Sequence, residues 1–325
     1  MKLAMKLNVR LFRSCSIAAV VLSLCTTGLV IAQAPDGYRR LAPGVFTTIP
    51  PQVDAAETVS YNNVVELQAI PDLEWNPQIN PKTKTLKEKG KNTPFRRDVW
   101  NLEFSFKPMR MMAVDLPQPG NKMRKTMIWY MVYRVKNNGA HLHPEPKVDE
   151  HGDTSYEIKN VDFPVTFSPQ FTLFSQKTGK SYLDKVMPVA VAAIQKREDP
   201  NRHLLDSVEM AATPIPVSTP TQDNSVWGVV TWDAGVDNGS QIDPRTDHFS
   251  IFISGLSNAY KFADVPGAYK HKDPPGKGRL YRQKMLQLNF WRPSDPTMDL
   301  EGEIFFGIPR EIGRGKQIDY QWIFR

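Results

Sequence analysis

Three histidines and a glutamate lie close together in the chain, at His141, His143, Glu145 and His151. In an extended segment, residues two apart point to the same side, which would place His141, His143 and Glu145 on one face. Imidazole nitrogens and carboxylate oxygens are ligands for Zn²⁺ and Ni²⁺, so these four residues form the predicted metal site. Glycine and proline bound the segment, and a solvated loop between two strands is the alternative interpretation.

Oxygen ligands concentrate in a second segment, from Asp233 to Asp243, which also contains Asp237 and Asn238. Ca²⁺ prefers such oxygens in a flexible loop. The spacing does not match an EF-hand, and Asp, Asn and Gly are also ordinary turn residues. A calcium-binding loop and a plain turn are both open at this point.

Other short motifs lack the context that their chemistry needs. Thr178-Gly-Lys-Ser181 falls in a predicted hairpin, whereas a phosphate-binding loop joins a strand to a helix. Ser254-Gly-Leu-Ser257 does not have the glycines on both sides of a serine that a nucleophile elbow requires. The sequence shows no glycine-rich dinucleotide fingerprint, so no cofactor is expected. Acid–base hydrolysis stays open, because Asp and Glu are spread along the chain and no pair of carboxylates stands out.

Residues 1–32 have the layout of an export signal, a basic stretch followed by a run without charge from 14 to 34. We expect cleavage after Ala32, because Pro35 makes the later small-residue site a poor substrate. An uncleaved membrane anchor and lipid attachment at Cys25 are the alternatives. The protein is therefore expected in the periplasm or outside the cell. The basic residues of this segment are Lys2, Lys6, Arg10 and Arg13.

Removing this segment changes what the composition implies. Both cysteines, Cys15 and Cys25, lie in it, so thiol chemistry and disulfides are excluded for the remaining chain. It also holds four of the 41 basic residues and no acidic one, so its loss lowers the formal net charge from +7 to +3. A clustered basic face for nucleic acid is not indicated.

The rest of the sequence predicts a mainly β protein, because its 27 prolines fall between short apolar runs. Residues 33–95 are expected to be an extended arm rich in proline and lysine. Its lysines between Lys82 and Lys91 suggest a solvated loop, with contact to an anionic envelope polymer as the alternative. Residues 96–325 are expected to form an immunoglobulin-like or related antiparallel β-sandwich with one short helix.

Hydrophobic periodicity places the elements of this domain. Alternation predicts strands with one solvated face at 99–106, 249–253, 286–290 and 318–324. Residues 126–135 are apolar on both faces, which is typical of a central strand. A hairpin is expected at 171–183, further strands at 226–232 and 303–307, and a helix at 188–199 with Pro188 first. Most tryptophans and tyrosines on these strands are expected in the core, and an exposed aromatic row would favour glycan binding.

Three stretches, 225–232, 246–260 and 318–325, resemble exported proteins of unassigned function from planctomycete-type bacteria. The resemblance covers about the last two thirds of the chain. It implies export and a β-rich body, and it implies no catalytic or ligand-binding residue.

The sequence thus predicts an exported, noncatalytic envelope or interaction protein whose partner is a protein or an envelope polysaccharide, and not nucleic acid. Contact with a membrane is expected only if the N-terminal segment is uncleaved. The alternative is a secreted carbohydrate-binding or carbohydrate-active protein. Two facing carboxylates or a row of exposed aromatics would favour that alternative.

Overall fold

The computed structural model describes residues 44–62, 90, 93–120, 122–151, 153–235, 241–293, 303–308 and 318–325. Residues 38–325 form one compact unit, and the other unit, residues 1–37, lies outside the described residues. The described part is mainly β, and the paired strands are antiparallel, as the sequence predicts. No helix among the described residues is long and apolar enough to cross a membrane.

A five-stranded sheet is built around β6 (Lys122–Lys136). Its order is β1 (Thr47–Ile49), β4 (Glu103–Phe106), β6 and β13 (Val226–Ala234), and β5 (Arg110–Gln118) also pairs with β6. The predicted central strand at 126–135 is therefore confirmed.

A seven-stranded sheet lies along β16 (Arg279–Trp291). Its order is β11 (Ser181–Leu183), β10 (Gln170–Ser175), β14 (His248–Ser254), β16 and β15 (Tyr260–Asp264). The short β17 (Phe305–Phe306) and the C-terminal β18 (Tyr320–Phe324) also pair with β16. The hairpin at 171–183 and the paired terminal strand are thus confirmed.

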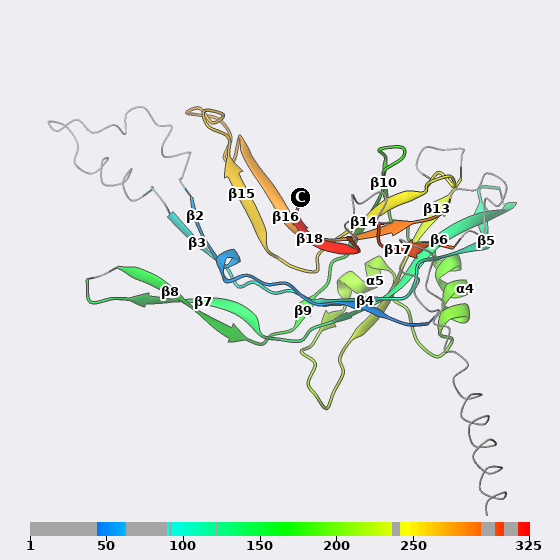
Figure 1. Cartoon of the computed structure of the whole chain (residues 1–325), viewed down its shortest axis with the longest axis horizontal. Coiled ribbons are helices and arrows are strands. Elements are labelled where there is room, and N and C mark those ends of the chain that lie inside the picture. The colour runs from blue at the N-terminus through cyan, green and yellow to red at the C-terminus, as the bar shows by residue number, and fades with distance from the viewer. Residues whose placement is uncertain are drawn as a thin grey trace, which may run out of the picture. The chain divides into compact units, whose positions relative to one another are not determined.

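The two sheets pack their apolar faces together, which makes the fold sandwich-like (Figure 1). Aromatic rings from one sheet contact those of the other, with centroids 5.4 Å apart for Trp129 and Phe249 and 5.0 Å apart for Tyr133 and Phe171. The expected core positions of Trp129, Tyr130, Tyr133 and Trp232 are confirmed, because all four side chains are buried.

The outer face of β6 is covered as well, by helix α4 (Pro188–Glu198). Ile128 and Val132 of the strand pack in one cluster with Ala190 and Ile194 of the helix. The helix begins with Pro188 and carries basic residues in its last turn, as predicted from the sequence. A second, six-residue helix, α5 (Ser207–Ala212), was not predicted; Asp206 caps it in a capping box.

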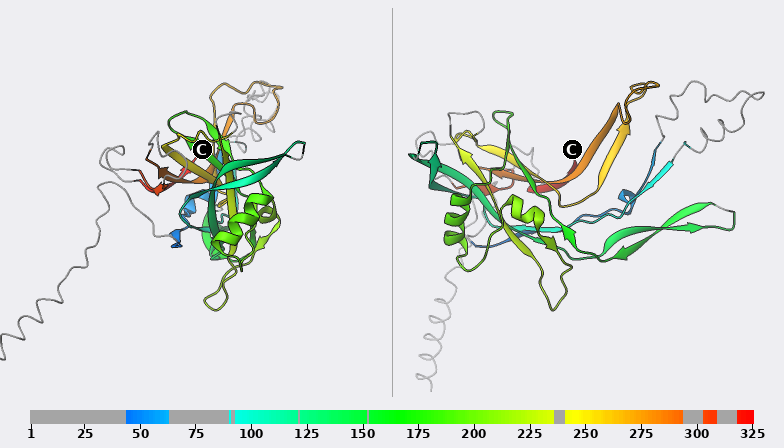
Figure 2. Two further views of the ribbon diagram at one scale, coloured as in Figure 1. Left: turned by 90° about the vertical axis from the view of Figure 1, so that its right-hand side faces the viewer. Right: turned by 180° about the vertical axis from the view of Figure 1, so that it is seen from behind.

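Three two-stranded sheets complete the described structure: β7 (His141–Val148) with β8 (Thr154–Val161), β2 (Val59–Asn62) with β3 (Thr93–Arg96), and β9 (Val165–Thr166) with β12 (Pro214–Ile215). A 3₁₀ turn, η1 (Ala55–Glu57), precedes β2. The β7–β8 hairpin and the outer half of the β15–β16 hairpin continue past the two large sheets in Figure 1 and in the right-hand view of Figure 2.

Two local expectations need correction. The interpretation of residues 141–148 as a loop is wrong, because they form β7 and pair with β8 along its whole length. The solvated faces expected for 99–106 and 249–253 are also wrong, since Asn101, Ser105 and Ser250 are buried. On the polar side of 286–290, Asn289 is buried as well. Asn101 Nδ2 donates a hydrogen bond to the Gln52 carbonyl (2.8 Å), and the Ser105 hydroxyl oxygen lies 2.9 Å from that of Thr48. The range 33–95 contains β1, η1, β2 and most of β3, while its lysine run lies almost wholly outside the described residues.

Candidate functional site

The histidine segment begins at a buried position on β7. Only 1% of His141 is exposed, its ring lies 4.4 Å from the ring of Phe163, and its Nε2 is 3.3 Å from the Phe163 carbonyl oxygen. Burial lowers the pKa of His141, against the opposing effects of that carbonyl and of Asp162. His141 is therefore packed into the protein as a neutral ring.

Of the other three members of the predicted metal site, His143 and Glu145 have separate partners. His143 Nδ1 is 2.6 Å from Asp98 Oδ1, and Glu145 is paired with Lys159 across the hairpin, which lowers the pKa of Glu145. His151 is exposed in the turn after β7. Among the described residues, no group of three His, Cys, Asp or Glu side chains is placed to hold a metal ion. The structure does not bring the four residues together.

The predicted calcium loop is described only at its two ends, and Asp237 and Asn238 lie outside the described residues. At one end, Asp233 Oδ1 is 2.6 Å from Lys185 Nζ, and Gln241 donates a hydrogen bond to Asp233 Oδ2. At the other end, Asp243 holds the Arg245 guanidinium. The pKa of Asp243 is lowered chiefly by this hydrogen-bonded cation.

A buried carboxylate, Glu198 at the end of α4, collects three donors. The Tyr130 hydroxyl and Arg110 Nη1 each lie 2.8 Å from Glu198 Oε1, and Lys107 Nζ lies 3.4 Å from Oε2. Burial, followed by the hydrogen bond to Glu198, raises the pKa of Tyr130. These contacts hold α4 against β5 and β6, and all three donors contact the same carboxylate, that of Glu198.

Lys284 and Glu57 form a second buried ion pair, which connects β16 to the 3₁₀ turn. Lys284 Nζ lies 2.7 and 2.9 Å from the two carboxylate oxygens and donates to the Gln52 carbonyl at 2.5 Å. Only 3% of the Lys284 side chain and 6% of the Glu57 side chain are exposed. Each charge has its partner, so the pair holds the chain before β2 onto the sheet.

Asp184 and Ser207 join β11 to α5. The Ser207 hydroxyl donates to Asp184 Oδ2 at 2.5 Å, and burial raises the pKa of Asp184. Ser207 is the first residue of α5 and follows its capping residue, Asp206. The contact therefore ties the beginning of the helix to the sheet.

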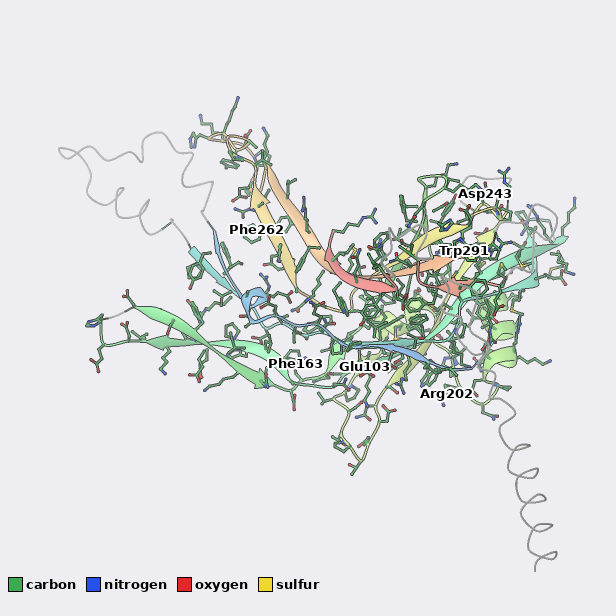
Figure 3. All side chains as sticks on the ribbon, in the orientation of Figure 1. Glu103, Phe163, Arg202, Asp243, Phe262 and Trp291 are labelled. Carbon is green, nitrogen blue, oxygen red and sulfur yellow. The ribbon has the colours of Figure 1, made fainter. Side chains whose placement is uncertain are left out.

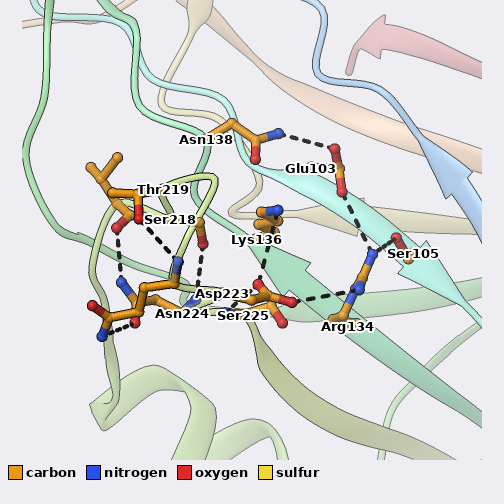
Figure 4. Close-up of polar contacts among 12 residues, drawn as sticks. Glu103, Ser105, Arg134, Lys136, Asn138, Ser218, Thr219, Asp223, Asn224 and Ser225 are labelled. Carbon is orange, nitrogen blue, oxygen red and sulfur yellow. Dashed lines mark hydrogen bonds and ion pairs between the residues drawn. The ribbon is translucent and has the colours of Figure 1, made fainter.

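A polar cluster on β4 and β6 holds the segment 218–225 against the sheet (Figure 4). Arg134 lies 3.8 Å from Glu103 and 3.9 Å from Asp223, and Lys136 lies 4.0 Å from Asp223. Partial burial opposes ionisation of Asp223, but hydrogen bonds from Ser225 and the two cations outweigh it and lower its pKa. The cluster contains two cations and two carboxylates, and such partly exposed pairs at 3.8–4.0 Å stabilise weakly.

Aromatic rings and guanidinium groups gather where β3 meets the β15–β16 hairpin, and Phe262 marks this place in Figure 3. Phe262 and Tyr281 are directly opposed across the hairpin with ring centroids 5.8 Å apart, and Phe95 of β3 meets Phe262 edge-on at 5.9 Å. Arg97 lies 4.0 Å above the ring of Tyr260, and Arg279 lies 4.8 Å above that of Phe262. We call these six residues the cationic aromatic cluster: Phe95, Arg97, Tyr260, Phe262, Arg279 and Tyr281.

Two rings of this cluster are exposed. Tyr281 is 65% exposed and Phe95 is 37% exposed, whereas Tyr260 and Phe262 are half-buried under the two arginines. A second exposed tyrosine, Tyr61, lies on β2 opposite Pro94 of β3. A row of exposed aromatic rings is the feature that would favour glycan binding.

The same hairpin carries an excess of positive charge. Residues 260–283 hold six Lys and Arg against two Asp. Asp264 is bound by Arg279 (2.6 Å) and Asp273 by Lys277 (2.9 Å), so both carboxylates are already engaged. The remaining four cations are exposed and form no ion pair within the described part of the chain. We call them the hairpin cations: Lys261, Lys270, Lys272 and Arg282.

Sequence reasoning missed this surface, although two signals were available. Three basic residues surround a tyrosine in Arg279-Leu-Tyr-Arg-Gln-Lys284, and basic residues are frequent around Pro274-Pro275. Neither signal is hydrophobic alternation, so only the inner half of β16 was predicted. The contact between Phe95 and Phe262 joins distant parts of the chain and has no local signature.

A second aromatic site offers a contrast. Trp227 of β13 lies 3.9 Å under the Arg202 guanidinium and meets Phe46 edge-on at 4.7 Å. Arg202 is also paired with Asp199 at 3.0 Å. Because the tryptophan is covered and the arginine is neutralised, this site has less to offer a ligand than the β15–β16 hairpin.

No protein-family model matches the chain, and no curated protein or solved structure matches it. The resemblance to exported proteins of planctomycete-type bacteria stays a prediction.

Proposed function

We propose that this chain is an exported, noncatalytic binding protein of the bacterial cell envelope. The observation that carries the proposal is the pair of hairpins that continue past the sheets. Residues 279–282 of β16 pair with β15 alone, and β7 and β8 form a sheet of their own. The outer parts of these hairpins carry exposed side chains that do not belong to the hydrophobic core and are available to a partner.

The use of buried charge supports the same proposal. The partners of Glu198 and Lys284 are residues of other elements of the fold, so these contacts connect elements to one another. Catalytic acids and bases instead face a substrate-sized space with a perturbed pKa. The hairpin cations, in contrast, are exposed and form no ion pair within the described part of the chain, which suits binding.

Export is part of this proposal and rests on the sequence layout of residues 1–32. An immunoglobulin-like relationship of the sandwich is likewise part of it, supported by the two packed antiparallel sheets. We expect the protein to act between the membrane and the envelope polymers, or at the cell surface.

The test combines location with binding. The full chain is expressed in a bacterium, the cells are fractionated, and the N-terminus of the protein is sequenced. We expect it outside the cytoplasm, beginning at Gln33. The purified chain from residue 33 should then sediment with isolated cell envelopes, and a chain in which residues 265–278 are replaced by a two-residue turn should sediment less. Cytoplasmic retention, or a wild-type chain that stays in the supernatant, contradicts the proposal.

Carbohydrate binding is the second candidate, and the exposed ring of Tyr281 favours it. Aromatic rings present a flat apolar face with polar groups at the rim, which suits the faces of sugars. This candidate concerns the kind of partner and is compatible with envelope binding. Release of reducing sugar ends from envelope polysaccharide would instead indicate a carbohydrate-active enzyme.

A further inference from the structure

We propose that the β15–β16 hairpin binds an anionic polysaccharide, through the hairpin cations and the exposed ring of Tyr281. This inference rests on the proposed function, because it assigns the chemical class of the envelope partner. Three observations support it. The hairpin cations are exposed, their positions destabilise the hairpin, and Tyr281 is the ring of the hairpin that is open to solvent.

The charge is placed where it costs stability. Lys261 and Arg282 are directly opposite each other in the register of β15 and β16, and like charges in that relation destabilise a sheet. At the tip of the hairpin, Lys272 has a φ of +77°, a left-handed conformation that a lysine adopts only with strain. A polymer carrying negative charges along its length would relieve the repulsion between the two strands.

The rings decide between classes of polyanion. Binding of a single-stranded nucleic acid uses successive open rings, one for each stacked base. Here the guanidinium groups of Arg97 and Arg279 already lie over Tyr260 and Phe262, which leaves Tyr281 as the open ring of the β15–β16 hairpin. The ring of Tyr281, with cations on either side, suits one sugar unit of a polysaccharide whose neighbouring sugar units carry negative charges.

Polygalacturonate and dextran sulfate are suitable probes for carboxylated and sulfated polymers, with uncharged dextran as the reference. Binding of the chain from residue 33 is measured by isothermal titration at two salt concentrations. We expect one or both polyanions to bind, with an affinity that falls as salt rises, and dextran not to bind. The same titration is run with oligothymidine and with phosphatidylglycerol vesicles, which we expect to bind at least about tenfold more weakly.

The charge variant combines Lys270→Gln, Lys272→Gly and Arg282→Glu. Glycine relieves the strained φ at 272, and glutamate at 282 pairs with Lys261, so this variant should fold at least as stably as the wild type. A control with the same loss of charge combines Lys122→Gln, Lys125→Gln and Lys147→Glu, three exposed lysines on other strands. We expect the first variant to bind at least about tenfold more weakly and the control to bind within about twofold of the wild type.

The ring is tested separately. Tyr281→Ala should weaken binding about five- to tenfold, and Tyr281→Phe, which keeps the ring, should retain it. Equal losses in the charge variant and its control would overturn the inference, because net charge alone would explain them. Equal binding of oligothymidine or vesicles, or no binding of either polysaccharide, would overturn it too.

The two proposals can fail separately. If the charge variant still sediments with envelopes as the wild type does, the polysaccharide inference is wrong and the envelope-binding proposal stands. If the wild type does not sediment, the envelope-binding proposal is wrong whatever the titrations show.

Discussion

At the scale of single residues, the buried pair of Lys284 and Glu57 shows how much one contact can hold. Removing either partner would leave the other charge buried without compensation, which typically costs about 3–5 kcal/mol. We expect Lys284→Met to lower the free energy of unfolding by about that amount, measured by urea denaturation. Adding Glu57→Leu should restore much of the loss, because the pair is then replaced by apolar groups.

The exposed pair of Lys159 and Glu145 is the matched control for this prediction. Lys159→Met should leave the urea midpoint unchanged, because water screens charges at that site. A Lys284→Met chain as stable as the wild type would show that the buried pair contributes nothing.

His141 is expected to make the stability of the fold depend on pH. Its pKa in the folded chain lies below the usual 6.5, because burial disfavours the charged ring. As the pH falls through about 6.5, the unfolded chain therefore takes up a proton before the folded chain does, and stability is lost. We expect His141→Gln to reduce this loss between pH 7 and 5, measured by thermal unfolding. His151→Gln, at an exposed position, should not, and an unchanged slope in His141→Gln would contradict the assignment.

At the scale of elements, the pairing of β13 with β6 depends on a glycine. Gly228 is opposite Tyr133, and a Cβ added there would lie 2.6 Å from the tyrosine ring and its hydroxyl. Gly228→Ala should destabilise the fold by about 1–3 kcal/mol through overpacking, measured by urea denaturation.

The matched test removes one of the obstructing atoms, the Tyr133 hydroxyl, and leaves the ring carbon and Met210 Cε in place. The Tyr133 hydroxyl is buried and has no hydrogen-bond partner among the described residues, so Tyr133→Phe should be neutral or stabilising. In the double variant it should recover part of the Gly228→Ala loss. A purely additive result would show that the two side chains do not compete for this space.

Elements differed in how far the sequence predicted them, and burial explains the difference. The inner half of β16 and β14 alternate clearly because one face of each belongs to the core. β8 and the outer half of β16 are exposed along most of their length, so they carry no hydrophobic period. Asn101 was expected in water because its type is polar, yet the chain before η1 covers it. The surface of the β15–β16 hairpin was not predicted for the same reason: its strands are exposed there, and exposed strands carry no hydrophobic period.

At the scale of the whole molecule, the sandwich and its hairpins should differ in local stability. Regions with few buried contacts open at low free energy, while core strands open only with global unfolding. β16 belongs to both regions: Leu286 and Leu288 are fully buried in the core, whereas Leu280 is 51% exposed and pairs with β15 alone.

This single strand allows an internal comparison by hydrogen exchange. Amides of residues 280–282 should exchange much faster than those of 286–288, although all of them belong to one strand. Saturating polygalacturonate should slow exchange at 280–282 and leave 286–288 unchanged, because a ligand protects the region that it orders. Uniform protection along β16 in the free protein would instead mean that the hairpin and the sandwich unfold as one unit, and that the binding surface is as rigid as the core.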